Sequence, residues 1–192
     1  MRIGVLALQG DFAEHRVMLQ RMGVTVIEVR LPEHLDGLEG LIIPGGESTT
    51  IAKLAVNFNL MDSLREFGQD KAMWGTCAGA IFMSRDAHRS QPLLQLMDIT
   101  VERNAFGRQV NSFEVDLNVP ALLEIDPVGR PFHGVFIRAP LIESVQAEAH
   151  TLAKLTDGRI VAAQQGRLLA TAFHPELTGD DRFHRYFLKL AA

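Results

Sequence analysis

The sequence predicts an α/β protein with a three-layer, doubly wound and mostly parallel sheet, extended by antiparallel strands in the C-terminal half. Three observations lead to this prediction. Apolar runs alternate with helical segments through the first half of the 192 residues, short strand-like runs separated by turn residues fill the second half, and no linker or repeat divides the chain. Residues 1–192 are therefore expected to form one domain of ordinary size.

The first half begins with a strand, a helix and a second strand. Residues 2–8 form a continuous apolar run, which is typical of a strand buried on both faces. Asp11 and Glu14 match a capping box, and the helix that they start is expected to end near Gly23. Residues 24–29 then predict the second strand.

The rest of the first half repeats this alternation. Two strands and two helices are expected at 41–43, 72–74, about 48–55 and about 61–67. Ser48 or Thr49 is the expected cap of the first of these helices. Because parallel strands end at one edge of a sheet, the loops that follow residues 43 and 74 are expected to meet there.

The second half is richer in strands. Six runs predict strands, at 99–101, 112–117, 135–138, 150–156, 160–165 and 168–174. Asp157-Gly158 and Gly166-Arg167 separate neighbouring runs and are typical of hairpin turns. A last helix is expected over 180–190, with apolar residues on one face. Residues 118–130 contain two prolines and a glycine and are expected to form a surface excursion.

Composition excludes several classes of protein. The net charge of −4 argues against binding nucleic acid through a broad basic field, and the one cysteine excludes disulfides and cysteine-based zinc sites. No apolar run approaches the roughly 20 residues of a membrane span, and the apolar N-terminus is too short for a signal peptide. We therefore expect a cytoplasmic protein without membrane contact. No bound metal is expected, because no His/Asp/Glu cluster has ligand spacing.

The lone cysteine lies in a nucleophile-elbow pattern. A single cysteine is most often a small buried hydrophobe, but Gly75-Thr76-Cys77-Ala78-Gly79 follows a short apolar strand and precedes an apolar helix. This is the cysteine version of G-x-S-x-G, in which small residues on either side let strand and helix approach closely. The start of the helix favours a thiolate, and the N–H of Ala78 is placed to bind an oxyanion.

A thiolate nucleophile requires a general base and a group that orients it. His174 and Glu176 follow the apolar run at 168–173, and residues two apart in an extended segment face the same side. The pattern predicts that the Glu176 carboxylate binds one ring nitrogen of His174 while the other faces Cys77. The remaining six histidines have no such partner pattern and are interpreted as surface or structural residues.

A glycine-rich loop provides a second candidate. Pro44-Gly45-Gly46-Glu47-Ser48 follows a predicted buried strand, and its two glycines allow backbone N–H groups to approach a ligand. The Gly45–Gly46 peptide can also flip, which suits the second half of an oxyanion hole. The spacing of a phosphate-binding P-loop is missing. An ordinary turn before a helix is the alternative interpretation.

These motifs together resemble the class I, or triad, glutamine amidotransferases. Within that class, blocks along nearly the whole chain resemble the glutaminase subunits of pyridoxal 5′-phosphate synthases; they are Leu8–Gly10, Pro44–Thr50, Gly75–Gly79, Val101–Gln109, Phe136–Pro140 and His174–Thr178. The stretch at 118–130 is longer than is usual in that family and carries no motif residue.

The resemblance implies a function and a set of site residues. Cys77 would attack the side-chain amide of L-glutamine, His174 oriented by Glu176 would transfer protons, and a glutamyl thioester would be hydrolysed to glutamate. Ammonia would pass to a separate synthase subunit that makes pyridoxal 5′-phosphate, in a heteromeric complex. The implied glutamine contacts are Gly46, Glu47, Ser48, Arg103, Ile137 and Arg138. The implied oxyanion hole is formed by Gly46 and Ala78, and Gln9 and Gly45 belong to activation by the partner. No cofactor is implied.

Three alternatives remain open at this point. A cysteine peptidase-like member of the same superfamily would share the elbow. A non-catalytic binding module would simply bury Cys77. A glutaminase subunit serving another ammonia-using synthase would share the chemistry and differ only in its partner.

Overall fold

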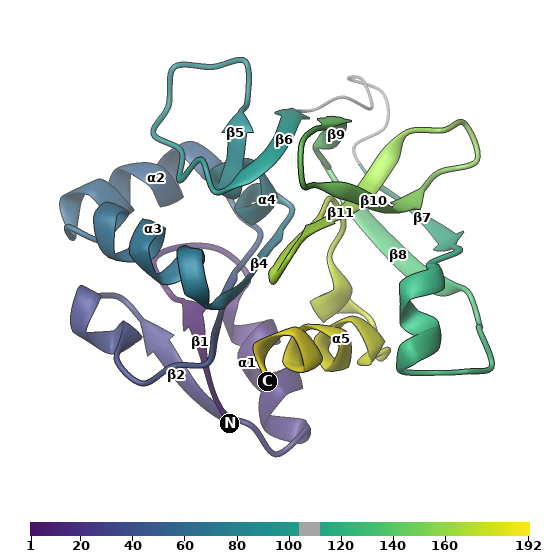
Figure 1. Cartoon of the computed structure of the whole chain (residues 1–192), viewed down its shortest axis with the longest axis horizontal. Coiled ribbons are helices and arrows are strands. Elements are labelled where there is room, and N and C mark those ends of the chain that lie inside the picture. Colours follow the sequence, from purple (N-terminus) through teal and green to yellow (C-terminus); the bar gives the residue numbers. More distant parts are fainter. Residues whose placement is uncertain (104–111) are drawn as a thin grey trace.

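A computed structural model describes residues 1–103 and 112–192 and contains a ten-stranded sheet and a separate two-stranded sheet (Figure 1). The strands of the large sheet lie in the order β2-β1-β3-β4-β12-β11-β9-β6-β5, with β10 paired to β11. Their bounds are β1 Arg2–Leu6, β2 Thr25–Val29, β3 Gly40–Ile43, β4 Ala72–Thr76, β5 Ser84–Asp86, β6 Met97–Glu102, β9 Leu141–Val145, β10 His150–Lys154, β11 Ile160–Gln165 and β12 Leu168–Thr171. The small sheet pairs β7, Ser112–Leu117, with β8, Phe132–Ile137.

Helices cover both faces of the parallel half of the large sheet. They are α1 Phe12–Arg21, α2 Ser48–Asn57, α3 Met61–Asp70, α4 Ala78–Met83 and α5 Arg182–Ala191, with 3-10 turns η1 Pro32–Leu35, η2 Pro120–Glu124 and η3 Pro175–Leu177. Alternate residues of a strand face opposite sides. Accordingly Leu41 packs in the cluster that contains α2, α3 and α4, whereas Ile42 packs in the cluster that contains α1 and α5.

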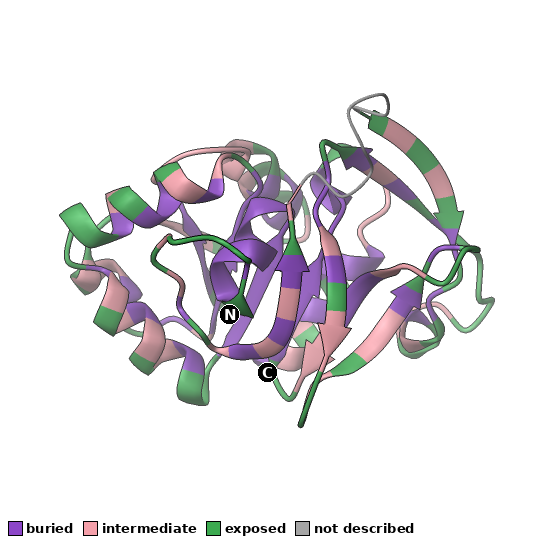
Figure 2. Cartoon of the chain, turned by 90° about the horizontal axis from the view of Figure 1, so that it is seen from above, coloured by how far each residue is buried: buried purple, intermediate pink, exposed green. Residues whose placement is uncertain are grey.

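The central strands are buried along their whole length (Figure 2). β3, β4 and β12 are parallel neighbours, with Ile43 opposite Gly75 and Thr171 opposite Thr76. The three segments that follow them therefore leave the sheet at the same edge. These segments begin at Pro44, Cys77 and Ala172, so the fold brings together the loops that the motifs occupy.

The small sheet packs beside this edge. Phe136 of β8 contacts Phe173, with ring centroids 5.4 Å apart. The N–H of His174 donates to the carbonyl of Val135 at 2.9 Å. The residues after β12 are thus fixed between the large sheet and β8.

The predicted fold class is confirmed, with differences in detail. The sequence does not predict β5 or β9. β5 pairs with β6 across a register shift, and β9 pairs with β6 across a register shift and with β11 through Ile142. The strand predicted to reach residue 174 ends at Thr171. The 118–130 stretch is only partly a surface excursion, because η2 buries Leu122.

Asp11 takes the predicted N-cap position of α1, but the capping hydrogen bond predicted there and the predicted cap of α2 are both wrong. The side chain of Asp11 makes no capping hydrogen bond at the start of α1. Glu47, rather than Ser48 or Thr49, caps α2, and its carboxylate accepts from the N–H groups of Thr49 and Thr50. The longer glutamate side chain can reach both groups at once. Among the described residues, no helix has both the length and the apolar character that crossing a bilayer requires.

Candidate active site

Cys77 occupies a sharp turn between β4 and α4. Its φ of 47° lies in the region that non-glycine residues rarely adopt, a strained conformation typical of functional sites. The N–H of Cys77 donates to the carbonyl of Thr171 at 2.8 Å, which ties the turn to β12. A Cβ atom at Gly75 would lie 2.5 Å from the Gly79 backbone, and one at Gly79 would lie 2.1 Å from the Ile43 carbonyl oxygen. The elbow therefore requires both glycines, as the pattern predicted.

His174 and Glu176 form a buried pair. The Nδ1 atom of His174 is 2.7 Å from Oε1 of Glu176, and both residues are less than 10% exposed. The extended geometry predicted for them is wrong beyond His174, because Pro175 and Glu176 begin η3. The pairing itself is present, since the 3-10 turn still brings the carboxylate to the ring.

Electrostatics favour the imidazolium form of His174. Burial acts to lower the pKa of His174, but hydrogen bonds to Cys77 and Glu176 and the negative charge of both outweigh it and raise that pKa to about 10. Burial raises the pKa of Glu176, against the hydrogen bond from His174. The arrangement thus supports a thiolate–imidazolium pair beside a carboxylate that depends on its neighbours to remain ionised.

The glycine-rich loop is fixed from two sides. Oε1 of Gln9 accepts from the N–H of Glu47 at 2.7 Å, and the N–H of Asp11 donates to the carbonyl of Gly45 at 3.1 Å. Gly46 has φ of 148°, and a Cβ atom at Gly45 would lie 2.5 Å from Cε1 of His174. The loop passes so close to the histidine ring that only glycine fits there.

Glu47 presents a strongly acidic carboxylate at the opposite end of the site. Desolvation opposes its ionisation, but hydrogen bonds from the hydroxyls and N–H groups of Thr49 and Thr50 lower the pKa of Glu47 to about 2. Oε1 of Glu47 also accepts from Nη2 of Arg103 at 2.9 Å. An ionised acid and an arginine therefore lie side by side, as recognition of a zwitterion requires.

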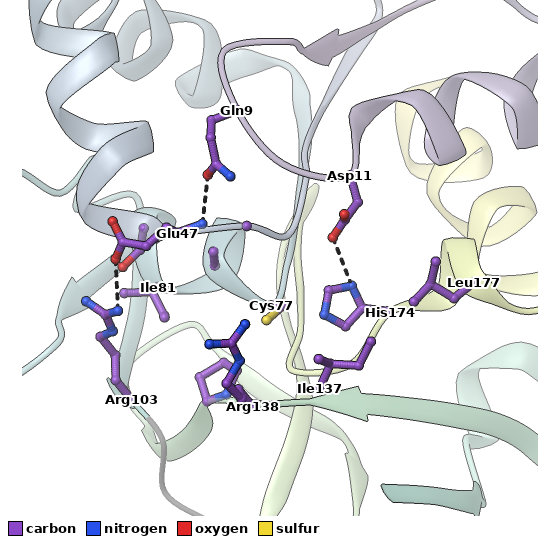
Figure 3. A pocket seen from close by; sticks show the side chains of 14 residues that line it. Gln9, Asp11, Glu47, Cys77, Ile81, Arg103, Ile137, Arg138, His174 and Leu177 are labelled. Carbon is purple, nitrogen blue, oxygen red and sulfur yellow. Dashed lines mark hydrogen bonds and ion pairs between the residues drawn. The ribbon is translucent and has the colours of Figure 1, made fainter. Parts of the chain in front are cut away.

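One cavity of about 480 Å³ joins these groups (Figure 3). All predicted site residues line it except Gly45 and Glu176, which contact the ring of His174 from behind. Ile137 and Arg138 line the wall opposite the loop, and Arg138 has φ of 43°. The cavity also includes residues to which no role was assigned, namely Asp11, Ile81, Pro140 and Leu177.

Asp11 is the most informative of these additions. Its Oδ2 atom lies 3.6 Å from Nδ1 of His174, so a second carboxylate faces the histidine (Figure 3). Within residues 1–103 and 112–192, the ligand atoms of Asp11, His174 and Glu176 form a group close enough to bind a cation. Because Nδ1 of His174 is already bonded to Glu176, the group is better explained as the acid–base pair of the site. The expectation that no metal is bound stays a prediction.

The fold and this site define the class of protein. A cysteine on a strand-to-helix elbow, facing a buried His–Glu pair on a doubly wound sheet, places the chain among the class I glutamine amidotransferases. The chain belongs to the SNO glutamine amidotransferase family, whose model matches residues 5–192. Residues 104–109 of the predicted family block at 101–109 lie outside the described residues.

Similar proteins agree with this assignment. The chain is 58% identical over 195 residues to the pyridoxal 5′-phosphate synthase subunit PdxT of Herpetosiphon aurantiacus, covering 99% of this chain and 100% of that protein. It is 55% identical to the PdxT of Moorella thermoacetica, covering 99% of each. These relatives confirm the predicted resemblance to such subunits.

Solved structures agree as well. A crystal structure of a glutamine amidotransferase, 51% identical, covers 98% of both chains with a TM-score of 0.91. The structure of PurLQS from Thermotoga maritima has a TM-score of 0.72 at 14% identity, over 100% of this chain and 98% of that one, which shows a shared fold alone.

Proposed function

We propose that this chain, as a single domain, hydrolyses L-glutamine to L-glutamate and ammonia and delivers the ammonia to a subunit that makes pyridoxal 5′-phosphate. The observation that carries the proposal is the buried His174–Glu176 pair beside Cys77, with His174 and Cys77 both lining the 480 Å³ cavity. The relatives that share more than half of its sequence carry the name pyridoxal 5′-phosphate synthase subunit PdxT, which supports the choice of partner.

The chemistry follows from the protonation states. The Cys77 thiolate attacks the side-chain amide carbon of glutamine, and the carbonyl oxygen takes up negative charge. His174, already protonated, gives its proton to the departing nitrogen, so that ammonia leaves and a glutamyl thioester remains on Cys77. Neutral His174 then takes a proton from water, whose oxygen attacks the thioester. The C–S bond breaks, which restores the thiolate beside the imidazolium, and the new carboxyl group loses the second proton of the water to solvent as glutamate leaves.

Recognition of free glutamine uses the two charged groups at the far end of the cavity. The α-ammonium would bind the carboxylate of Glu47, and the α-carboxylate would bind Arg103 and Arg138. Gly46, Ser48 and Ile137 would contribute backbone and wall contacts. The existing Glu47–Arg103 ion pair, 2.9 Å long, is then divided between the two charged groups on the α-carbon of the substrate.

The oxyanion hole combines the N–H of Ala78 with the N–H of Gly46, and the second of these is the regulated part. The carbonyl of Gly45 belongs to the same peptide as the N–H of Gly46, and the N–H of Asp11 holds that carbonyl. Reorienting the peptide requires this bond to break. Docking of the partner near Gln9, which holds the next N–H in the loop, would supply the free energy.

The deciding experiment measures glutamate release with and without the synthase subunit. We expect slow hydrolysis by the free chain, strong activation in the complex and loss of activity in Cys77→Ser. Labelling by an electrophilic glutamine analogue should disappear in the same variant. Equal turnover with and without the partner would contradict the activation. Cleavage of peptides but not of glutamine would favour the peptidase-like alternative, and complex formation with another synthase would replace the proposed partner.

A further inference from the structure

Two buried histidines lie directly behind the catalytic carboxylate, and the mechanism above does not use them. His15 of α1 and His184 of α5 are both fully buried. Nδ1 of His15 lies 3.0 Å from Nε2 of His184. On its other side, Nε2 of His15 faces Oε2 of Glu176 at 3.4 Å and Oγ1 of Thr76 at 3.2 Å. The two rings thus continue the row Cys77–His174–Glu176 away from the cavity.

Both rings are neutral at neutral pH. Burial lowers the pKa of His184 to about 3. Burial, together with the charges of His184 and His174, lowers the pKa of His15 well below its ordinary value. A neutral imidazole has one N–H donor and one acceptor nitrogen. The row therefore has only two possible directions of hydrogen bonding.

In the first direction, Nε2–H of His184 donates to Nδ1 of His15. The proton of His15 is then on Nε2, which lies 3.2 Å from Oγ1 of Thr76 and 3.4 Å from Oε2 of Glu176. The atom left over is Nδ1 of His184, which has no hydrogen-bond partner among the described residues. In this tautomer that nitrogen is only an unused acceptor.

In the second direction, Nδ1–H of His15 donates to His184. A buried N–H at Nδ1 of His184 would then have no acceptor, and the lone pair at Nε2 of His15, to which the Thr76 hydroxyl could donate, would face the carboxylate of Glu176. Orphaned buried N–H groups are rarer than under-satisfied acceptors. Facing lone pairs at 3.4 Å also repel each other. The first direction is the one that satisfies the buried groups.

We propose that His15 is a positioning residue for the glutaminase reaction, with its Nε2–H directed by His184 toward the second oxygen of Glu176. Glu176 then has a donor on each side, His174 at Oε1 and His15 at Oε2. Among the described residues Oε2 has no partner that meets the geometry of a hydrogen bond, and Nε2 of His15, 3.4 Å away, is the ring nitrogen that faces it. The contact orients the carboxylate and opposes its protonation in a buried site. This inference rests on the proposed glutaminase activity.

The central test compares His15→Leu with His15→Gln in the complex with the synthase subunit. Leucine removes the donor, whereas the amide of glutamine can place an N–H near the position of Nε2. We expect His15→Leu to lower kcat by about 10- to 100-fold with KM for glutamine changed less than about twofold, and His15→Gln to recover most of the loss. A kcat for His15→Leu equal to wild type would overturn the proposal.

The pH profile separates positioning from simple packing. The charged or titratable groups that act on Glu176 are His174, His15 and the carboxylate of Asp11, which further raises the pKa of Glu176. Without the His15 donor the pKa of Glu176 rises, so the acid limb of kcat in His15→Leu should shift to higher pH. An acid limb identical to wild type at a reduced kcat would indicate a packing defect and would overturn the proposal.

Two further measurements keep the proposal testable if His15→Leu does not fold. His15→Asn places its amide near Nδ1 instead of Nε2, so its kcat should be at least about fivefold below that of His15→Gln; equal values would refute the inference. Nitrogen-15 spectra of histidine-labelled protein should show the Nε2–H tautomer at both His15 and His184. An Nδ1–H tautomer at His15 would also refute it. If the wild-type complex releases no glutamate, the proposed function fails instead.

Discussion

Replacing Glu176 with glutamine tests the electrostatic basis of the site. The substitution retains the shape of the side chain and removes its charge from a position 2.7 Å from Nδ1 of His174. The rise of the His174 pKa from 6.5 to about 10 corresponds to roughly 5 kcal/mol in favour of the imidazolium. Cys77 contributes more of this effect than Glu176, so somewhat less than half of it, about 2 kcal/mol, is the expected loss. That free energy equals a factor of roughly 30 in the proton-transfer equilibrium.

The reactivity of Cys77 toward iodoacetamide measures this change without substrate or partner. A His174 pKa lowered from about 10 by this amount still lies above 7, so the change should appear at alkaline pH: the limb of the alkylation profile at which the imidazolium of His174 is lost should lie about 1.5 pH units lower in Glu176→Gln than in wild type. Glu114→Gln is the matched control, since it removes an exposed carboxylate from His133 on the small sheet, away from the cavity. Its alkylation rate should equal that of wild type. An equal rate and an equal pH dependence in Glu176→Gln would refute the reasoning.

Three other predictions follow from individual contacts. Gly79→Ala would place a Cβ atom 2.1 Å from the Ile43 carbonyl oxygen and should reduce the free energy of unfolding by about 3 kcal/mol, whereas Gly179→Ala, with nothing within 4 Å, should melt like wild type. Glu47→Gln should raise KM for glutamine by about tenfold or more; because the pKa of Glu47 is about 2, wild-type KM should not show a titration of this group between pH 4 and 8. Because the pKa of His174 is raised to about 10 in the folded state, its protonation contributes fully to the free energy of unfolding below pH 6.5. This contribution should decline as the pH rises from 6.5 through 10 and should be smaller in Glu176→Gln. Urea unfolding at a series of pH values measures it.

Features that depend on local sequence were predictable. The elbow at Cys77 is determined by the small residues on either side of it, and the order of strands and helices in the first half follows from apolar periodicity. The edge at which Pro44, Cys77 and His174 meet follows from the parallel pairing of β3, β4 and β12. The sequence therefore predicts both the nucleophile and the loops that lie next to it.

Features that depend on contacts between distant segments were not predictable. His15 was interpreted as a surface or structural residue because nothing in α1 indicates that α5 would cover it, and His184 lies 169 residues further along the chain. Asp11 was assigned to a helix cap, yet its side chain faces His174. Both residues belong to the segment that follows β1. Only the packing of that segment against the end of β12 and α5 reveals what they contact.

That segment links the two parts of the site that must act together. Gln9 and the N–H of Asp11 hold the glycine-rich loop, and four residues later the first turn of α1 brings His15 to Glu176. A displacement of α1 large enough to release the Gly45 carbonyl would therefore also change the distance between His15 and the carboxylate. Binding at this helix can act on the oxyanion loop and on the orientation of the general base through one rigid element. Regulation of such a site requires no separate signal to each half, because the continuous segment from Gln9 into α1 contacts both.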